Sequence, residues 1–162
     1  MSLAEVRGHV ARWTTAGEPW VEATLVRVER SAPRLPGARF TISAGGDAAG
    51  SISAGCVESD LHEHMLQALA DRVPRLVRYG ISDERAADVG LSCGGEIEVL
   101  ICPRIGSDPI WTELEAILDD EKAGLLLTGI SGRLIGRRML VRSDGSIVAR
   151  GFDGQGPGRV IS

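Results

Sequence analysis

Apolar residues recur at steps of three and four along three stretches of the chain. In the second stretch, Val57, Leu61, Met65 and Leu69 are each four residues apart. This spacing places apolar side chains on one face of an amphipathic helix. We therefore predict helices over residues 3–16, 57–69 and 109–123, and a short helical turn over residues 82–89.

Other stretches alternate apolar and polar residues, which is the period of a β-strand with one buried face. The longest covers residues 20–29, and its phase slips by one residue at Leu25-Val26. Because such a slip moves every later side chain to the other face, we predict either a β-bulge or a strand covered on both faces. Further strands are predicted over residues 39–43, 49–53, 76–79, 96–103, 125–130, 138–143 and 146–150.

Two parts of the chain resemble each other. Residues 37–47 align with residues 136–145, and each copy follows a helix and one strand. Residues 104–162 therefore look like a helix plus a β-meander that repeats residues 20–53. We hypothesise that the two meanders pack into one sheet. The predicted fold is α+β, a single domain over residues 1–162 with a mixed or largely antiparallel sheet and about three helices packed on it.

Composition and charge narrow the functional classes. The 162 residues suffice for one compact domain, and a net charge of −4 with interspersed signs excludes a nucleic-acid binder, which would carry a basic face. No apolar run approaches the roughly 18 residues of a membrane span, and charges near the N-terminus argue against a signal peptide. We expect a cytoplasmic protein with neither nucleic acid nor a membrane as its partner.

The chain has three cysteines without CxxC spacing, which indicates neither a disulfide framework nor a zinc site. Cys56 follows Gly55 at a predicted strand-to-helix junction, where backbone N–H groups favour a thiolate or another anion. Glu58 and Asp60 oppose this by raising the thiol pKa, so a packing role for Cys56 stays open. Cys102 is interpreted as structural.

Cys93 is followed by Gly94-Gly95, whose backbone N–H groups are able to converge on an anion. The alternative is a glycine-rich hairpin entry in which the thiol is incidental. Arg34 lies between two prolines in a loop over residues 31–37, which suits it to clamping a phosphate or a carboxylate.

Four blocks of the sequence, taken together, resemble the amino-terminal domain of the XdhC/CoxI family. They contain the motifs Pro33-Arg34, Gly55-Cys56-Val57-Glu58 and Cys93-Gly94-Gly95 and cover residues 22–39, 50–58, 78–80 and 90–99. The resemblance is strong over residues 20–103 and weak over residues 104–162. It implies a maturation factor for molybdenum hydroxylases such as xanthine dehydrogenase or carbon monoxide dehydrogenase.

The resemblance implies a non-catalytic chaperone that binds molybdenum cofactor (molybdopterin) transiently and delivers it, in sulfurated form, to the apoenzyme. It makes Cys56 and Cys93 the thiols that contact the cofactor and its molybdenum, which soft thiolates suit. The predicted cofactor-binding residues are Cys56, Cys93, Gly55, Gly94, Gly95, Arg34 and Glu58.

The resemblance also sets expectations about other cofactors and partners. Family members continue into a Rossmann-type domain, whereas this chain has no G-x-G-x-x-G fingerprint, so we expect no NAD binding. The expected partners are an apo molybdenum hydroxylase, a cysteine desulfurase or a separate Rossmann-domain chain, and further copies of this chain in a homo-oligomer.

Two other functional classes stay open from the residues alone. One is a thiol-dependent sulfur-transfer or redox enzyme that uses Cys56 or Cys93. The other is a structural or assembly module, in which the glycine motifs serve tight packing and exposed strand edges mediate association.

Overall fold

The structure is a computed structural model that describes residues 3–80, 94–106, 108–151 and 159–161. The predicted helical turn over residues 82–89 and Cys93 lie outside the described residues. Three α-helices occur within the described ranges, and none of them is long and apolar enough to cross a membrane. They are α1 (Leu3–Thr15), α2 (Glu58–Asp71) and α3 (Pro109–Asp119).

The strands form two sheets. The first has the order β3-β2-β1-β5-β4-β9 and the second has the order β6-β7-β8. All pairs are antiparallel except β4 with β9, which confirms the predicted α+β class. The strands are β1 (Trp20–Glu29), β2 (Arg39–Ser43), β3 (Ala48–Gly50), β4 (Arg75–Tyr79), β5 (Glu96–Arg104), β6 (Gly124–Thr128), β7 (Arg138–Arg142), β8 (Ile147–Gly151) and β9 (Arg159–Ile161); a 3₁₀ turn, η1 (Gly132–Leu134), precedes β7.

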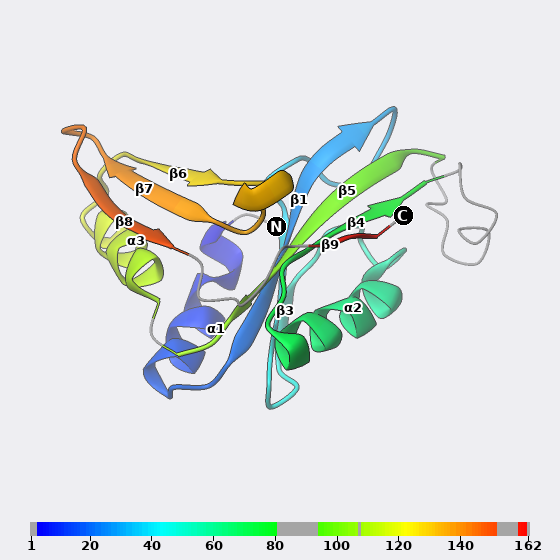
Figure 1. Ribbon diagram of the computed structural model, residues 1–162, viewed down its shortest axis with the longest axis horizontal. Helices are drawn as coiled ribbons and strands as arrows, with labels where there is room; N and C mark the ends of the chain where they lie inside the picture. The colour runs from blue at the N-terminus through cyan, green and yellow to red at the C-terminus, as the bar shows by residue number, and fades with distance from the viewer. Residues whose placement is uncertain (1–2, 81–93, 107, 152–158, 162) are drawn as a thin grey trace.

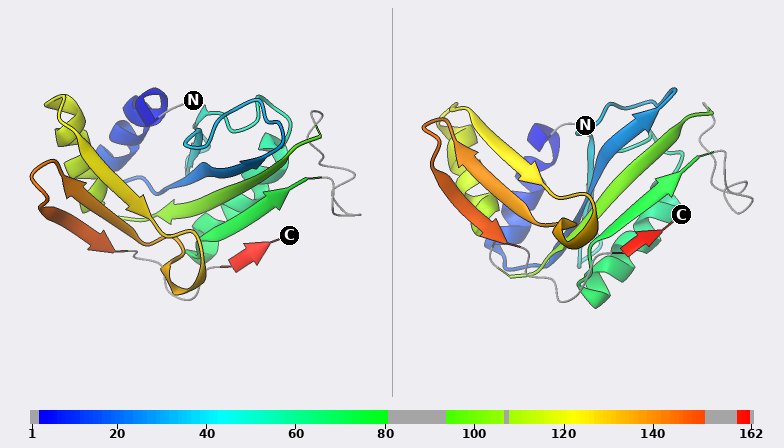
Figure 2. Two further views of the ribbon diagram at one scale, coloured as in Figure 1. Left: turned by 90° about the horizontal axis from the view of Figure 1, so that it is seen from above. Right: turned by 45° about the horizontal axis from the view of Figure 1, so that its top comes forward.

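The helices cover three faces of the two sheets (Figures 1 and 2). Helix α2 packs its apolar stripe on one face of the first sheet. Helices α1 and α3 share a second core with the opposite face of that sheet and with one face of the second sheet. In that core the ring centroids of Trp20 and Trp111 lie 5.6 Å apart in an edge-to-face arrangement.

Both halves of the predicted repeat are three-stranded antiparallel meanders, but the hypothesis that they form one sheet is wrong. The middle strand β2 belongs to the first sheet and the middle strand β7 belongs to the second. Strands in one sheet lie about 4.8 Å apart, whereas a helix is about 10 Å wide. Because α1 and α3 bury their apolar stripes between the meanders, the meanders cannot pair side by side.

The phase slip in β1 is a β-bulge, as predicted. The register against β5 shifts between Leu25 and Arg27, and Val26 turns to the face opposite Leu25. The predicted strand over residues 49–53 is wrong at its end, because β3 stops at Gly50. The Ser51 N–H still donates to the carbonyl of Arg39 in β2, but the N–H groups of Ile52 and Ser53 are donated to the carboxylate of Glu58 instead of a neighbouring strand.

Replacing Leu140 in β7 with alanine is expected to lower the free energy of unfolding by about 2–5 kcal/mol, because this side chain is fully buried among α3 residues. Leu127→Ala is the matched control on neighbouring β6. Its side chain is 42% exposed, so the expected loss is below about 0.5 kcal/mol. Urea denaturation measures both variants, and equal losses would contradict this assignment of the core.

Candidate functional site

The segments that carry the predicted site lie at one end of the first sheet. The loop over residues 31–37 follows β1, Gly94-Gly95 leads into β5, and Cys56 lies two residues before the start of α2. In Figure 1 the end of β1, the start of β5 and the first turn of α2 lie on the same side of the molecule. These three segments, far apart in the sequence, therefore lie at the same end of the first sheet, and a site shared by them stays a prediction.

Gly95 joins two of these segments directly. It is buried, and a Cβ atom at this position would overlap the carbonyl oxygen of Ser31. Only glycine allows the backbone that precedes β5 to come so close to the loop that follows β1. Gly94 has a φ of +69°, a left-handed conformation that also favours glycine.

Glu58 closes the loop that contains Cys56. Its carboxylate accepts hydrogen bonds from the backbone N–H groups of Ile52 (3.1 Å), Ser53 (2.9 Å) and Gly55 (2.9 Å). The hydroxyls of Ser51 and Ser53 also donate to it, so both carboxylate oxygens are engaged. Burial opposes ionisation of Glu58, but these hydrogen bonds outweigh it and lower the pKa to about 2.

The same loop presents Cys56 to solvent. Ala54 and Gly55 both adopt positive φ, at 58° and 109°, and the chain then turns into α2 through the buried Val57. Cys56 itself is exposed. The predicted alternative of a buried packing residue is therefore wrong, because Val57 fills the core position beside it.

Asp60 and Tyr79 connect the start of α2 to the end of β4. The Tyr79 hydroxyl donates to Asp60 Oδ2 at 2.8 Å, and His64 Nε2 lies 3.4 Å from the same oxygen. Burial and this hydrogen bond raise the pKa of Tyr79. This contact was not predicted from the sequence, since nothing in the spacing of Asp60 and Tyr79 indicates it.

Arg34 lies in the loop after β1 and is partly buried. No hydrogen bond or ion pair to another residue engages its guanidinium within the part of the chain that the structure describes. A guanidinium without a carboxylate partner suits recognition of an added anion. Arg34 therefore stays a predicted anion-binding residue, and Cys93 stays a prediction outside the described residues.

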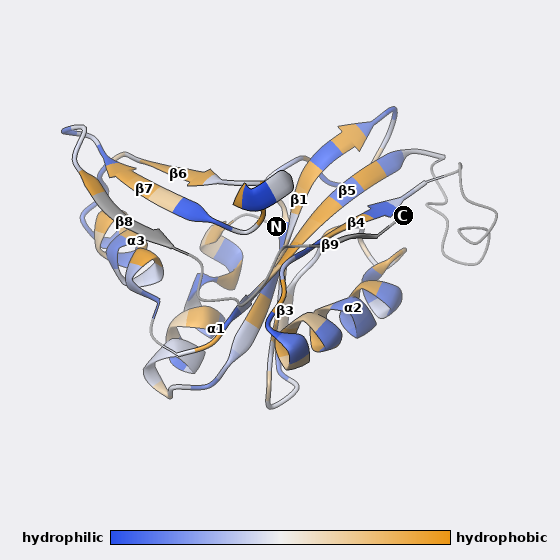
Figure 3. Ribbon diagram, in the orientation of Figure 1, coloured by the Kyte–Doolittle hydropathy of each residue, from blue (hydrophilic) through white to orange (hydrophobic). Residues whose placement is uncertain are grey.

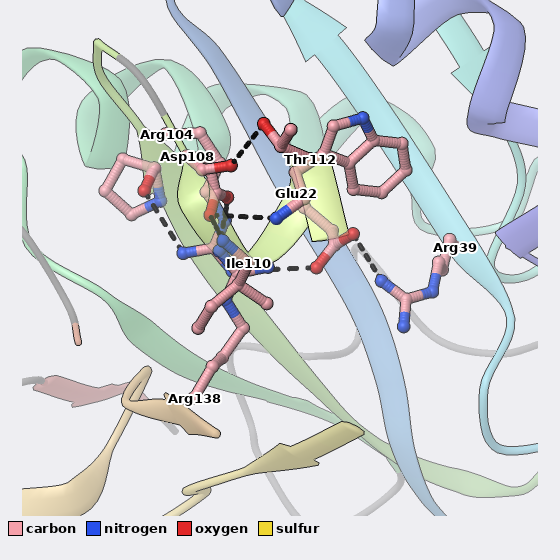
Figure 4. Close-up of polar contacts among 9 residues, drawn as sticks. Glu22, Arg39, Arg104, Asp108, Ile110, Thr112 and Arg138 are labelled. Carbon is pink, nitrogen blue, oxygen red and sulfur yellow. Dashed lines mark hydrogen bonds and ion pairs between the residues drawn. The ribbon is translucent and has the colours of Figure 1, made fainter. Parts of the chain in front are cut away.

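A second group of charged residues lies at the opposite end of β1 and β5, and Figure 4 shows its contacts. Glu22 pairs with Arg39 and lies 3.7 Å from Arg104 Nη2, measured from Glu22 Oε1. Asp108 pairs with Arg138 and lies 3.6 Å from Arg104 Nε, measured from Oδ2. We call these five residues the buried charge cluster.

The buried charge cluster joins the two sheets. Glu22 and Arg104 come from β1 and β5, whereas Arg138 comes from β7. Asp108 caps α3, because its Oδ1 accepts the N–H groups of Ile110 at 3.1 Å and Trp111 at 3.2 Å. A helix beginning at residue 109 was predicted from the sequence, but the contact of Asp108 with Arg138, 30 residues later, was not.

The arginines of the cluster keep the buried carboxylate of Glu22 ionised. Burial alone would raise the pKa of Glu22, but the positive charges of Arg39, Arg104 and Arg138 lower it to about 2. Burial raises the pKa of the neighbouring Cys102 thiol, so this cysteine is protonated at neutral pH. Among the described residues, no group of three or more His, Cys, Asp or Glu side chains is arranged to hold a metal ion.

Glu58→Gln is expected to lower the free energy of unfolding at pH 7 by roughly 1–3 kcal/mol, because a neutral amide cannot satisfy the same donors. Folding lowers the pKa of Glu58 from its usual 4.5 to about 2, so the ionised carboxylate contributes its full stabilisation above about pH 4.5. This stabilisation is lost as the pH falls toward about 2. Thermal melts of the variant should therefore depend less on pH in this window. The exposed Glu63→Gln on α2 should retain the wild-type profile.

Gly95→Ala is expected to destabilise the protein by about 1–3 kcal/mol or more, because the added Cβ overlaps the Ser31 backbone. Gly8→Ala is the control, since a Cβ at Gly8 in α1 meets no atom within 4 Å. That control should stabilise the helix by about 0.5–1 kcal/mol. Chemical denaturation compares them, and a neutral Gly95→Ala would disprove the close approach.

Comparison with known proteins identifies related sequences over part of the chain. Residues 13–80 match the model of the XdhC and CoxI family. The protein YqeB of Escherichia coli (strain K12), described as uncharacterized, is 37% identical over 83 residues, which are 51% of this chain and 15% of that protein.

The fold is similar to that of a solved structure described as a xanthine dehydrogenase from Bacillus halodurans. The TM-score is 0.71 at 24% sequence identity, and the match covers 95% of this chain and 46% of that chain. This likeness supports the same fold over nearly the whole chain. The chain spans less than half of the length of each of these two relatives. The match over residues 13–80 confirms, for this part of the chain, the resemblance to the XdhC and CoxI family that was predicted from the sequence blocks lying within it.

Proposed function

We propose that this protein is a maturation factor for a molybdenum hydroxylase, and that it binds molybdenum cofactor and delivers it to the apoenzyme. The observation that carries the proposal is the family match over residues 13–80, which contains the exposed Cys56 on its closed loop. A carrier of this kind needs a thiol that solvent reaches and a backbone that holds it in place. The loop closed by Glu58 supplies both.

The donor set at this end of the first sheet fits such a cofactor. When bound, the cofactor supplies a molybdenum centre that takes soft sulfur ligands and a phosphate that takes cationic donors. Cys56 would provide the thiolate and the partly buried Arg34 would provide a guanidinium. Cys93 and Gly94, from the segment that leads into β5, complete the proposed site.

Glu58 takes a different role in this proposal from the one expected of a ligand-contacting residue. Its oxygens already accept from the loop, and the N–H groups of Ile52, Ser53 and Gly55 are donated to them. These N–H groups are therefore engaged and do not face a phosphate. We assign Glu58 as a positioning residue that sets the orientation of Cys56.

The proposed partners follow from the same function. The recipient would be an apo molybdenum hydroxylase, and a cysteine desulfurase would supply sulfur. A Rossmann domain on a separate chain and self-association into a homo-oligomer belong to the same proposal, and no NAD binding is proposed for residues 1–162.

The proposal is tested by mixing the purified chain with equimolar molybdenum cofactor under anaerobic, reducing conditions and separating the mixture by gel filtration. Pterin fluorescence should elute with the protein. Cys56→Ser should abolish this retention, whereas Cys102→Ser should preserve it, because Cys102 is buried at the other end of β5. Release of all the pterin by the wild-type chain would refute the proposal, and equal retention by both variants would refute the role of Cys56.

Arg34→Gln is expected to weaken cofactor affinity by about tenfold to a hundredfold, the loss typical of a charge-assisted hydrogen bond. Arg27→Gln removes the same charge from an exposed position on β1 and should leave affinity unchanged. Equilibrium titration of pterin fluorescence measures both variants. Equal affinities would exclude Arg34 from the site.

A further inference from the structure

The second sheet has an apolar face that no helix among the described residues covers. Leu125 and Leu127 pair across the sheet with Val141 and Met139, and Val141 pairs with Ile147, so all five side chains share one face. We call this the outer face. Leu125 is 57% exposed, Leu127 is 42% exposed and Ile147 is 49% exposed. Figure 3 shows the apolar colouring along β6 and β7.

The internal repeat identifies the equivalent face in the first sheet. The register of β1 with β2 matches that of β6 with β7, because Trp20 to Thr24 pair with Ser43 to Arg39 as Gly124 to Thr128 pair with Arg142 to Arg138. The four aligned pairs on this face are Val21 with Leu125, Ala23 with Leu127, Phe40 with Met139, and Ile42 with Val141.

In the first sheet these equivalent residues form the main core. Val21, Ala23 and Ile42 are completely buried and Phe40 is 8% exposed. The element that buries them is α2, through the apolar residues Val57, Leu61, Met65 and Ala68. The same surface is therefore covered by an amphipathic helix in one repeat and open in the other.

The opposite faces of the two meanders do not differ in this way. Helix α1 packs beside β2 and β3, and α3 packs in the same manner beside β7 and β8. After β3 the chain enters α2, whereas after β8 it next contributes β9, which pairs with β4 in the first sheet. The second repeat thus reproduces the first except for the covering helix (Figure 2).

Charge at the rim of the outer face restricts the helix that fits it. Arg133 and Arg137 are exposed beside Leu134, which is itself 61% exposed. Because Arg138 points inward, its neighbour Arg137 lies on the outer side of the strand. In the first repeat, the covering helix α2 begins with acidic residues, Glu58 and Asp60.

We propose that the outer face binds an amphipathic helix of a partner protein, with apolar side chains every three to four residues and acidic residues near Arg133 and Arg137. The described helices of this chain already bury their apolar stripes, so none of these three helices in a second copy is available to cover the outer face. This interaction surface is independent of the cofactor site, which lies at the far end of the first sheet.

The probe is a synthetic peptide with the sequence of residues 57–71, the covering helix of the first repeat, titrated into the ¹⁵N-labelled chain. Amide shifts should change along β6, β7 and β8 and stay constant along β1. Leu127→Asp should weaken peptide binding by about tenfold, since it places a charge on the contact face. Leu66→Asp is the control, because Leu66 is similarly exposed, at 45%, on the outside of α2.

Two results would overturn the proposal. One is the absence of shift changes on the second sheet, or their appearance along β1 instead. The other is a concentration-dependent dimer of the wild-type chain in sedimentation velocity that Leu127→Asp abolishes, because it would assign the outer face to a second copy. Both variants alter exposed side chains, so the fold should persist, and circular dichroism checks this directly.

Discussion

The placement of the two sheets depends on the buried charge cluster. Asp108 caps α3 with one oxygen and pairs with Arg138 of β7 through the other, while Arg104 of β5 approaches both Asp108 and Glu22. Buried charges cost several kcal/mol each unless they are paired and hydrogen-bonded. Sliding one sheet against the other would leave these charges uncompensated, so the cluster specifies a single arrangement.

At the other end of the first sheet, the same β1 and β5 flank the proposed site. There a polar side chain fixes a backbone loop, because the Glu58 carboxylate accepts hydrogen bonds from N–H groups in the loop that follows β3. The loop rests on Val57 and on a close approach of Gly95 to Ser31. The exposed Cys56 is therefore mounted on an ordered scaffold, as binding residues commonly are.

Much of the local structure could be predicted because it depends on residues that are close together in the sequence. The helices followed from apolar spacing, and the bulge in β1 followed from the phase slip at Leu25-Val26. The end of β3 could not be predicted, since Glu58 competes for the N–H groups that the strand would have used. Nor could the cluster, because its ion pairs join residues that are distant in the chain.

The sequence by itself determined the α+β class, the two meanders and the family of residues 13–80, because periodicity and motif spacing are local properties. Only the tertiary structure decided that the meanders form two sheets, since that depends on α1 and α3 packing between them. It also decided that Cys56 is exposed, and that no helix among the described residues covers the outer face of the second meander as α2 covers the equivalent face of the first. Burial depends on which elements meet, and alternation along a strand is the same whether or not a helix lies over it.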